Sequence, residues 1–230
     1  MFYSIIVRKN NGQNPHPFLD VVRDYINNFG TDDILVCFPG FMSFSSTSLK
    51  NFHDNYPLDT KSVPNQNRCI FFEGMNGYRI VSGTASIAQD YLNNLYGQSS
   101  PSVFQTGEDH SKVVFFVDGT KKYKDSDDLI QKILHGLVKI KALSVGSSNL
   151  SDNTMTKSPI SAKGETDLLL VDFDPTDLLD IEEKLLVIFD HKKQGEDYNP
   201  VMVSKQISVN DPNYLLNIFI DMIQNDDNNK

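Results

Sequence analysis

Short apolar runs alternate with amphipathic segments along most of this chain. Continuous apolar runs such as Ile34–Phe38 and Val113–Val117 predict strands buried on both faces. Apolar residues repeat at helical spacing after Ser126, where Asp127 and Asp128 stand in an expected first turn. This alternation of strands and helices predicts an α/β fold with a mixed β-sheet flanked by helices.

The same patterns predict the remaining elements. Further strands are expected at 1–8, 69–72, 78–81, 142–145, 166–173 and 200–209. Helices are expected at 18–29, 48–56, 84–96, 126–138, 176–189 and 213–223, and polar loops at 98–109 and 150–164. Because neither an internal repeat nor a clear linker is present, we expect one domain over residues 1–224 and a disordered tail at 225–230.

Charge is distributed unevenly along the 230 residues. The net charge of −9 argues against a general nucleic-acid coat protein, which is usually basic. Residues 110–163 nevertheless carry +4, whereas residues 1–109 carry −3 and residues 164–230 carry −10. The positive segment is either a solvated face or a contact surface for a polyanion, and the sequence leaves both interpretations open.

No segment has the features of a membrane span, an export signal or a metal site. Apolar runs stay below the roughly 18–20 residues of a span, and the N-terminal segment reads as a strand. Cys37 and Cys69 lie in strand-like runs, where buried thiols are expected. The histidines and cysteines lack zinc-ligand spacing. We therefore expect a cytoplasmic protein without stable membrane insertion, cofactor or metal.

Two polar motifs adjoin two of the expected strands. His110 and Lys112 lead into Val113–Val117, while Ser147 and Asn149 follow the strand at 142–145. Side chains at i and i+2 of a strand share a face, so each motif offers a pair. If the strands are neighbours, an imidazole, an ammonium, a hydroxyl and an amide surround one point. Such a set suits a phosphate, with donors for its oxygens and a possible nucleophile.

The order of these motifs resembles the phospholipase D superfamily, which includes phospholipases, metal-independent nucleases and phosphodiesterases. His-x-Lys enters an apolar strand, Gly-Ser-x-Asn follows a second strand, and a glutamate opens a third. The matching residues, which span about a quarter of the chain, are His110, Lys112, Gly146, Ser147, Asn149 and Glu165. A second His-x-Lys at His191 has no Gly-Ser-x-Asn after it and is interpreted as a solvated helix end.

The resemblance implies a phospholipase D-like fold and a metal-independent phosphodiester hydrolase. In that scheme His110 attacks phosphorus and forms a phosphohistidine. Lys112 and Asn149 hold the non-bridging oxygens, and Ser147 donates a further hydrogen bond. Glu165 fixes the tautomer of the imidazole.

Two departures from the family pattern concern the segment between the motifs. The family places an aspartate five residues after the lysine, where this chain has Val117, and strand alternation turns Asp118 to the other face. The family also joins the two motifs by a tight turn, whereas residues 119–141 here insert a helix. We expect this insertion to lie beside the site and shape its mouth. Its lysines, either substrate contacts or solvated charges, are Lys121, Lys122 and Lys124.

A single motif copy leaves the site without a general acid for the leaving group. We therefore expect a homodimer in which two His110 side chains meet across a twofold axis. The favoured function is a nuclease that cleaves DNA or RNA. The alternatives are a phospholipase D-type hydrolase of lipids or small phosphodiesters, and a non-catalytic phospholipase D-like module for dimerisation or binding.

Overall fold

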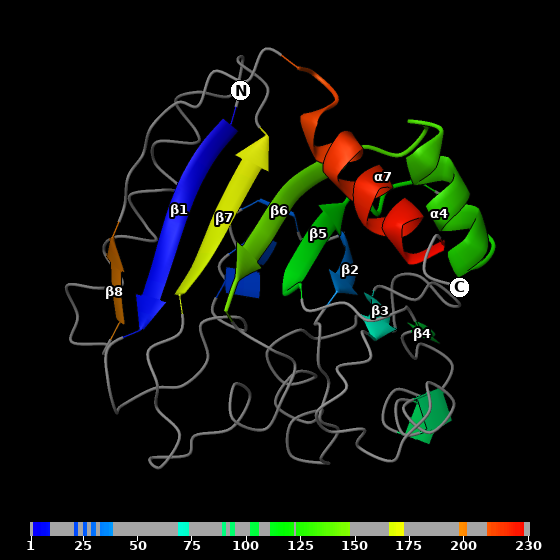
Figure 1. The fold of residues 1–230 in the computed structure, drawn as a ribbon, viewed down its shortest axis with the longest axis horizontal. Helices are drawn as coiled ribbons and strands as arrows, with labels where there is room; N and C mark the ends of the chain where they lie inside the picture. The colour runs from blue at the N-terminus through cyan, green and yellow to red at the C-terminus, as the bar shows by residue number, and fades with distance from the viewer. Residues whose placement is uncertain are drawn as a thin grey trace.

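The computed structural model describes the sheet, two of its helices and several shorter pieces (Figure 1). The described residues are 2–9, 21–22, 25–26, 29–30, 33–38, 69–73, 89–90, 93–94, 102–105, 111–121, 123–147, 166–172, 198–201 and 211–227. The strands are β1 (Phe2–Lys9), β2 (Ile34–Phe38), β3 (Cys69–Glu73), β4 (Ser102–Gln105), β5 (Val113–Val117), β6 (Ile140–Gly146), β7 (Thr166–Asp172) and β8 (Tyr198–Val201). The helices described over their whole length are α4 (Ser126–Leu134) and α7 (Tyr214–Asp227).

The strands of this described part form one mixed sheet. Their order is β4-β3-β2-β5-β6-β7-β1-β8 (Figure 1). The β2–β3 and β3–β4 pairs are parallel, and the other pairs are antiparallel. The mixed α/β sheet expected from the hydrophobic pattern is therefore present, with β5 and β6 near its centre.

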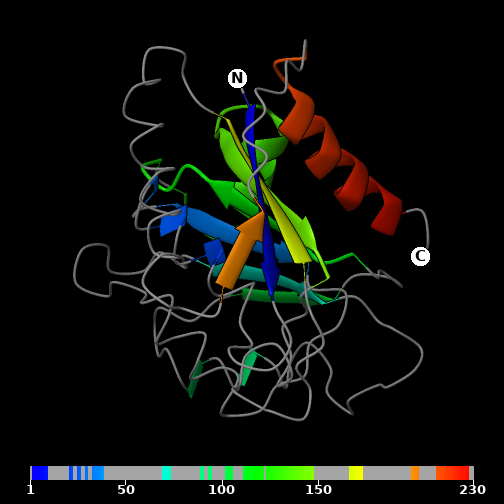
Figure 2. The ribbon, with the colours of Figure 1, turned by 90° about the vertical axis from the view of Figure 1, so that its left-hand side faces the viewer.

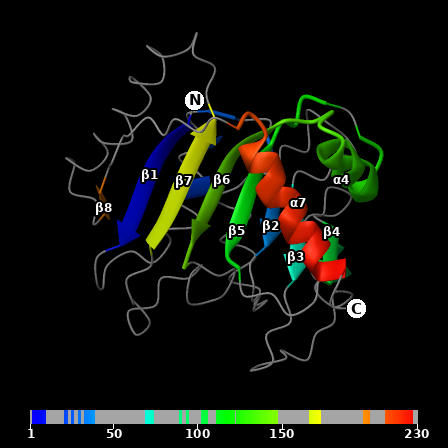
Figure 3. The same cartoon turned by 45° about the horizontal axis from the view of Figure 1, so that its top comes forward.

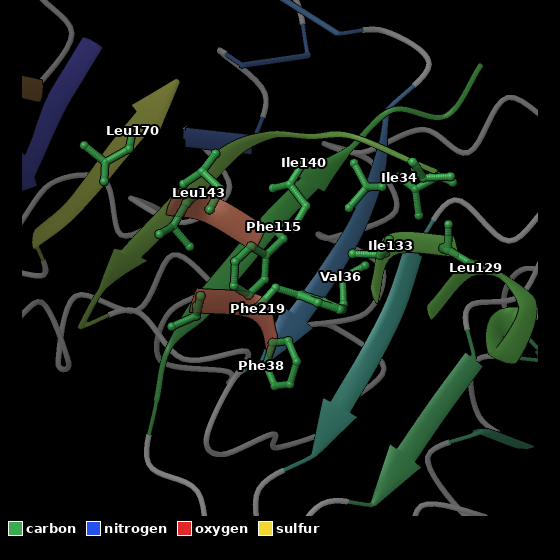
Figure 4. Packing of buried hydrophobic residues seen from close by; sticks show 14 residues of the cluster. Ile34, Val36, Phe38, Phe115, Leu129, Ile133, Ile140, Leu143, Leu170 and Phe219 are labelled. Carbon is green, nitrogen blue, oxygen red and sulfur yellow. The ribbon is translucent and has the colours of Figure 1, made fainter. Parts of the chain in front are cut away.

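Helices α4 and α7 cover one face of the sheet, as the views in Figures 2 and 3 show. Phe219 of α7 is fully buried and packs edge-on against Phe115 of β5 and Phe38 of β2, with ring centroids 5.1 and 6.3 Å apart (Figure 4). Leu129 and Ile133 extend this core from α4. Burial of large apolar side chains along one stripe of each helix fixes both helices on the sheet.

The opposite face is also covered, since β2 and β5 are buried along their whole lengths. Val21, Val22 and Tyr25 lie in helical positions and are buried. The Tyr25 ring packs at a tilt against that of Phe116, which points away from α7, with ring centroids 4.0 Å apart. Strands covered on both faces need apolar residues at every position, which explains the continuous runs in the sequence.

A buried ion pair ties this second face together. The Asp33 carboxyl is 1% exposed, accepts a hydrogen bond from the Tyr25 hydroxyl at 2.6 Å and pairs with the Lys141 ammonium at 2.9 Å. The register of β5 against β6 shifts between Phe116 and Val117, so Lys141 has no opposing residue. Such a bulge redirects a side chain, and here it turns Lys141 toward Asp33 while Ile140 stays in the core under α7.

Several element boundaries differ from the sequence-based expectations. Residues 98–109 are not wholly a loop, because they contain β4. The N-cap of α4 is Asp125, whose side chain accepts from the Asp128 amide, and α4 ends at Leu134 rather than 138. Helix α7 continues past its last apolar residue to Asp227, three residues into the expected disordered tail, so the apolar pattern does not mark where this helix ends.

Other expectations lie outside the described residues, namely the strand at 78–81, the helices at 48–56 and 176–189, and the loop at 150–164. The single domain over 1–224 also stays a prediction. In the part of the chain that the structure describes, no helix is both long and apolar enough to cross a membrane.

Replacing Lys141 should destabilise the fold in a pH-dependent way. Burial raises the pKa of Asp33, and the hydrogen bonds from Tyr25 and Lys141 offset this only in part. Lys141→Met leaves the buried Asp33 carboxylate without its cationic partner at pH 7, so we expect a loss of about 3 kcal/mol in the free energy of unfolding. As pH falls through the raised pKa, the folded state takes up a proton before the unfolded state does, so the loss should shrink. Urea unfolding at pH 7 and pH 4.5 measures both values.

The matched control is Lys132→Met, which removes a partly exposed pair with Asp128 on α4. That variant should lose little stability at either pH. Equal losses in the two variants, or a pH-independent loss in Lys141→Met, would contradict the assigned role of Asp33.

Candidate functional site

The two polar motifs meet at one end of the central strands. This line of strand ends, where β5 begins and β6 ends, is called the site edge of the sheet. β5 begins at Val113 and β6 ends at Gly146, and the strands pair antiparallel with Val113 opposite Val145. The Gly146 amide donates to the Lys112 carbonyl at 3.1 Å, which carries the pairing one residue beyond the β5 strand. Lys112 and the Gly146-Ser147 segment, more than thirty residues apart in sequence, are therefore neighbours. The start of β5 and the end of β6 both lie at the lower edge of the sheet in Figure 1.

Ser147 does not continue the strand, contrary to the expectation from the sequence. β6 ends at Gly146, and Ser147 is an exposed bend. The two-residue alternation of a strand therefore does not set the direction of the Ser147 side chain. A glycine followed by a bend lets the chain leave the sheet plane at the site edge.

The third strand of the expected site also reaches this edge. β7 begins at Thr166, and Asp167 stands directly opposite Gly146. Glu165 immediately precedes the strand. Asp167 is 3% exposed, and sequence reasoning missed it. Its signal was its position two residues after Glu165, which places both on one face if the strand geometry extends back.

Of the five proposed catalytic residues, Lys112 and Ser147 are described, and they lie at neighbouring strand ends. His110, Asn149 and Glu165 lie outside the described residues. Lys112, Ser147 and Thr166, which lie within two residues of them in sequence, are however brought to one edge by β5, β6 and β7. The convergence of the five side chains remains a prediction.

Asp118 stands at the other end of β5, away from Lys112. Five strand residues lie between the two, so their Cα atoms are about 20 Å apart at the usual rise per residue. The Asp118 carboxylate accepts hydrogen bonds from the Thr120 amide at 3.0 Å and the Thr120 hydroxyl at 2.6 Å. Its partial burial alone would raise its pKa, but these bonds and the Lys141 ammonium together lower it. Asp118 is a turn residue, and Val117 in the family's aspartate position is core.

The expectation that the insertion at 119–141 borders the site is wrong. The chain leaves β5 at Val117 and returns at Ile140, so α4 lies between them at the edge opposite Lys112 (Figure 3). Any insertion between two antiparallel strands lies where the first strand ends. Because the motif occupies the start of β5, the long spacer neither obstructs nor shapes the site. Lys121 and Lys124 are exposed at that far edge.

Ion pairs also engage three of the nine lysines of the middle segment. Lys132 pairs with Asp128 at 2.7 Å, and Lys139 pairs with Asp172 at 2.9 Å. Lys141 pairs with Asp33. These three lysines therefore pair with carboxylates of the same chain, so the positive segment is not a uniform surface for binding a polyanion.

A cavity of about 300 Å³ also lies at the far edge, between the end of α4, the start of β6, the end of β7 and the start of α7. Its wall includes the Lys139–Asp172 pair. None of the candidate site residues lines it. Among the described residues, no three histidine, cysteine, aspartate or glutamate side chains are grouped so as to hold a metal ion.

Comparisons with known proteins give a distant likeness among solved structures. No protein-family model matches the sequence, and no curated protein matches it at a significant level. Among solved structures, Nuc from Salmonella typhimurium, a phospholipase D family member, is similar with a TM-score of 0.36 and 10% sequence identity, over 88% of this chain and 100% of that chain. This likeness is weak, and the site assignment depends on the residues of this chain.

Asp118→Ala should affect the fold and leave the site unchanged. Loss of the two Thr120 hydrogen bonds should lower the free energy of unfolding by about 1 kcal/mol. Binding of orthophosphate should stay within about twofold of wild type, because the carboxylate lies a whole strand length from Lys112. Urea unfolding and titration calorimetry measure the two effects. A large loss of phosphate binding without further destabilisation would instead assign Asp118 to the site.

Proposed function

We propose that the chain is a metal-independent phosphodiesterase of phospholipase D type, namely a nuclease, that works through a phosphohistidine on His110. One observation supports this most. The β5–β6 register, extended by the Gly146–Lys112 hydrogen bond, makes neighbours of two motif halves that the sequence separates by a helix. Motifs that had arisen by chance on unpaired strands would not be expected to share an edge.

The chemistry divides one displacement into two. A ring nitrogen of neutral His110 attacks phosphorus, and the leaving oxygen departs with a proton from a general acid. Water then attacks the phosphohistidine and gives a proton to the group that acted as the general acid. This step releases His110 and a phosphomonoester. Lys112, Ser147 and Asn149 stabilise the charge on the non-bridging oxygens throughout, and Glu165 orients the imidazole.

The general acid is the reason to propose a homodimer. His135 is exposed and its Nδ1 lies 2.6 Å from the Gln131 carbonyl on α4, at the edge opposite Lys112. It cannot serve the site within one chain. A second His110 supplied by a partner copy across a twofold axis would provide the missing group.

Nuclease activity should persist in EDTA and should depend on His110. We expect wild type to cleave single- or double-stranded DNA or RNA, and His110→Ala to reduce the rate by more than about 10³-fold, since the nucleophile is removed. Gel assays with end-labelled strands measure the rate. His191→Ala, which alters the second His-x-Lys, is the matched control and should retain the wild-type rate.

The substrate series separates the alternatives. Cleavage of bis(p-nitrophenyl) phosphate or phosphatidylcholine without cleavage of nucleic acid would favour the lipid or small-phosphodiester hydrolase. Absence of turnover with every phosphodiester, in a preparation that remains folded and dimeric, would favour the non-catalytic module.

Subunit mixing tests the shared site. Wild type is exchanged with a fourfold excess of His110→Ala, and activity is measured per wild-type subunit. If each site needs His110 from both copies, activity should fall to about one fifth, the chance that a wild-type subunit meets a wild-type partner. Undiminished activity per wild-type subunit, or a monomeric mass in sedimentation equilibrium, would contradict the shared site.

A further inference from the structure

Three central strands place Lys112, Gly146 and Asp167 in one row across the sheet. Gly146 of β6 is hydrogen-bonded to Lys112 on one side and stands directly opposite Asp167 of β7 on the other. Directly opposite residues of antiparallel strands point to the same face. This face is the one away from α7, because the neighbouring Val113 belongs to the core under α7.

Gly146 leaves the middle of this row without a side chain. Adjacent antiparallel strands are about 5 Å apart, so the Lys112 and Asp167 backbones are separated by about 10 Å. Any larger residue at 146 would place its Cβ between them. The long, flexible stem of Lys112, which is half-buried, can therefore extend its ammonium over Gly146 toward Asp167.

Asp167 has a burial that is unusual for a carboxylate at a strand end. It is 3% exposed, whereas buried carboxylates require a hydrogen-bonding or charged environment to stay ionised. A carboxylate beside an anion site would by itself repel phosphate. An ammonium placed between the two removes that repulsion and gains a charge-assisted hydrogen bond on each side.

We propose that Asp167 is a positioning residue of the phosphate site. In the phosphate-bound state the Lys112 ammonium lies above Gly146 and donates both to a phosphate oxygen and to the Asp167 carboxylate. Asp167 thus acts through Lys112 and does not touch the substrate. This inference rests on the phosphate-binding site of the proposed function and adds to it a residue that the motif resemblance does not include.

The direction in which one substitution changes the affinity for orthophosphate tests the proposal. Asp167→Asn removes a negative charge, so electrostatics alone would strengthen anion binding. Loss of the anchor for Lys112 should instead weaken the binding of orthophosphate by about tenfold or more. Asp167→Glu should recover part of the affinity. Calorimetric titration of the full-length protein with orthophosphate measures all three, and Asp221→Asn on the exposed side of α7 is the charge-matched control, which should bind as wild type does.

A double-mutant cycle with Lys112→Gln assigns the effect to Lys112. In the Lys112→Gln background, Asp167→Asn should cause no further weakening. Weakening of the same size in both backgrounds, or unchanged or tighter binding in Asp167→Asn alone, would overturn the proposal, as would the absence of phosphate binding by wild type.

If Asp167→Asn does not fold, Gly146→Ala replaces it. A methyl group in the row should weaken phosphate binding at an unchanged melting temperature, and unchanged binding would overturn the proposal.

Cleavage assays on the same wild-type preparation test the nuclease separately. Phosphate binding that Asp167→Asn weakens, without any cleavage, would support the positioning role and defeat the nuclease. Cleavage that depends on His110, with phosphate binding insensitive to Asp167, would support the nuclease and overturn the positioning role.

Discussion

The antiparallel register between β5 and β6 determines where each candidate group of this protein lies. Both strands are near the centre of the sheet, and β5 is buried along its whole length between two layers. A shift of this register by one residue would move every core side chain of a strand to the opposite face. The packing of Phe115 against Phe219 under α7, and of Phe116 against Tyr25 on the other face, therefore holds Lys112 beside Gly146.

The two ends of β5 serve different purposes. At its start, Lys112, Gly146 and Asp167 form a row that is open in the middle and charged at both sides. At its end, Asp118, Lys141 and Asp33 form a compact polar cluster that closes a turn and a bulge. Asp33 and Asp118 thus act as structural carboxylates at one edge, whereas Asp167 of β7 is a candidate site carboxylate at the other. Distance along the strand, rather than residue type, separates the roles.

Apolar runs and helical periodicity predicted the mixed α/β sheet, because a strand buried on both faces needs a continuous apolar run. Ile34–Phe38 and Val113–Val117 are strands with the expected burial. Local patterns were less reliable for short or edge elements: β4 lies in a segment expected to be a loop, and α7 extends past its last apolar residue. Edge strands bury less apolar surface, so their periodicity is weak.

By itself the sequence determined the residue types of the candidate site, their order, and the strands that they adjoin. It did not determine which strand ends are neighbours, since strand pairing depends on contacts between segments far apart in the chain. The tertiary structure decided that the 119–141 insertion lies away from Lys112, that Lys132, Lys139 and Lys141 are engaged in ion pairs, and that the buried Asp167 faces Gly146. Each of these follows from the packing of both sheet faces, which selects one register among those that local pattern allows.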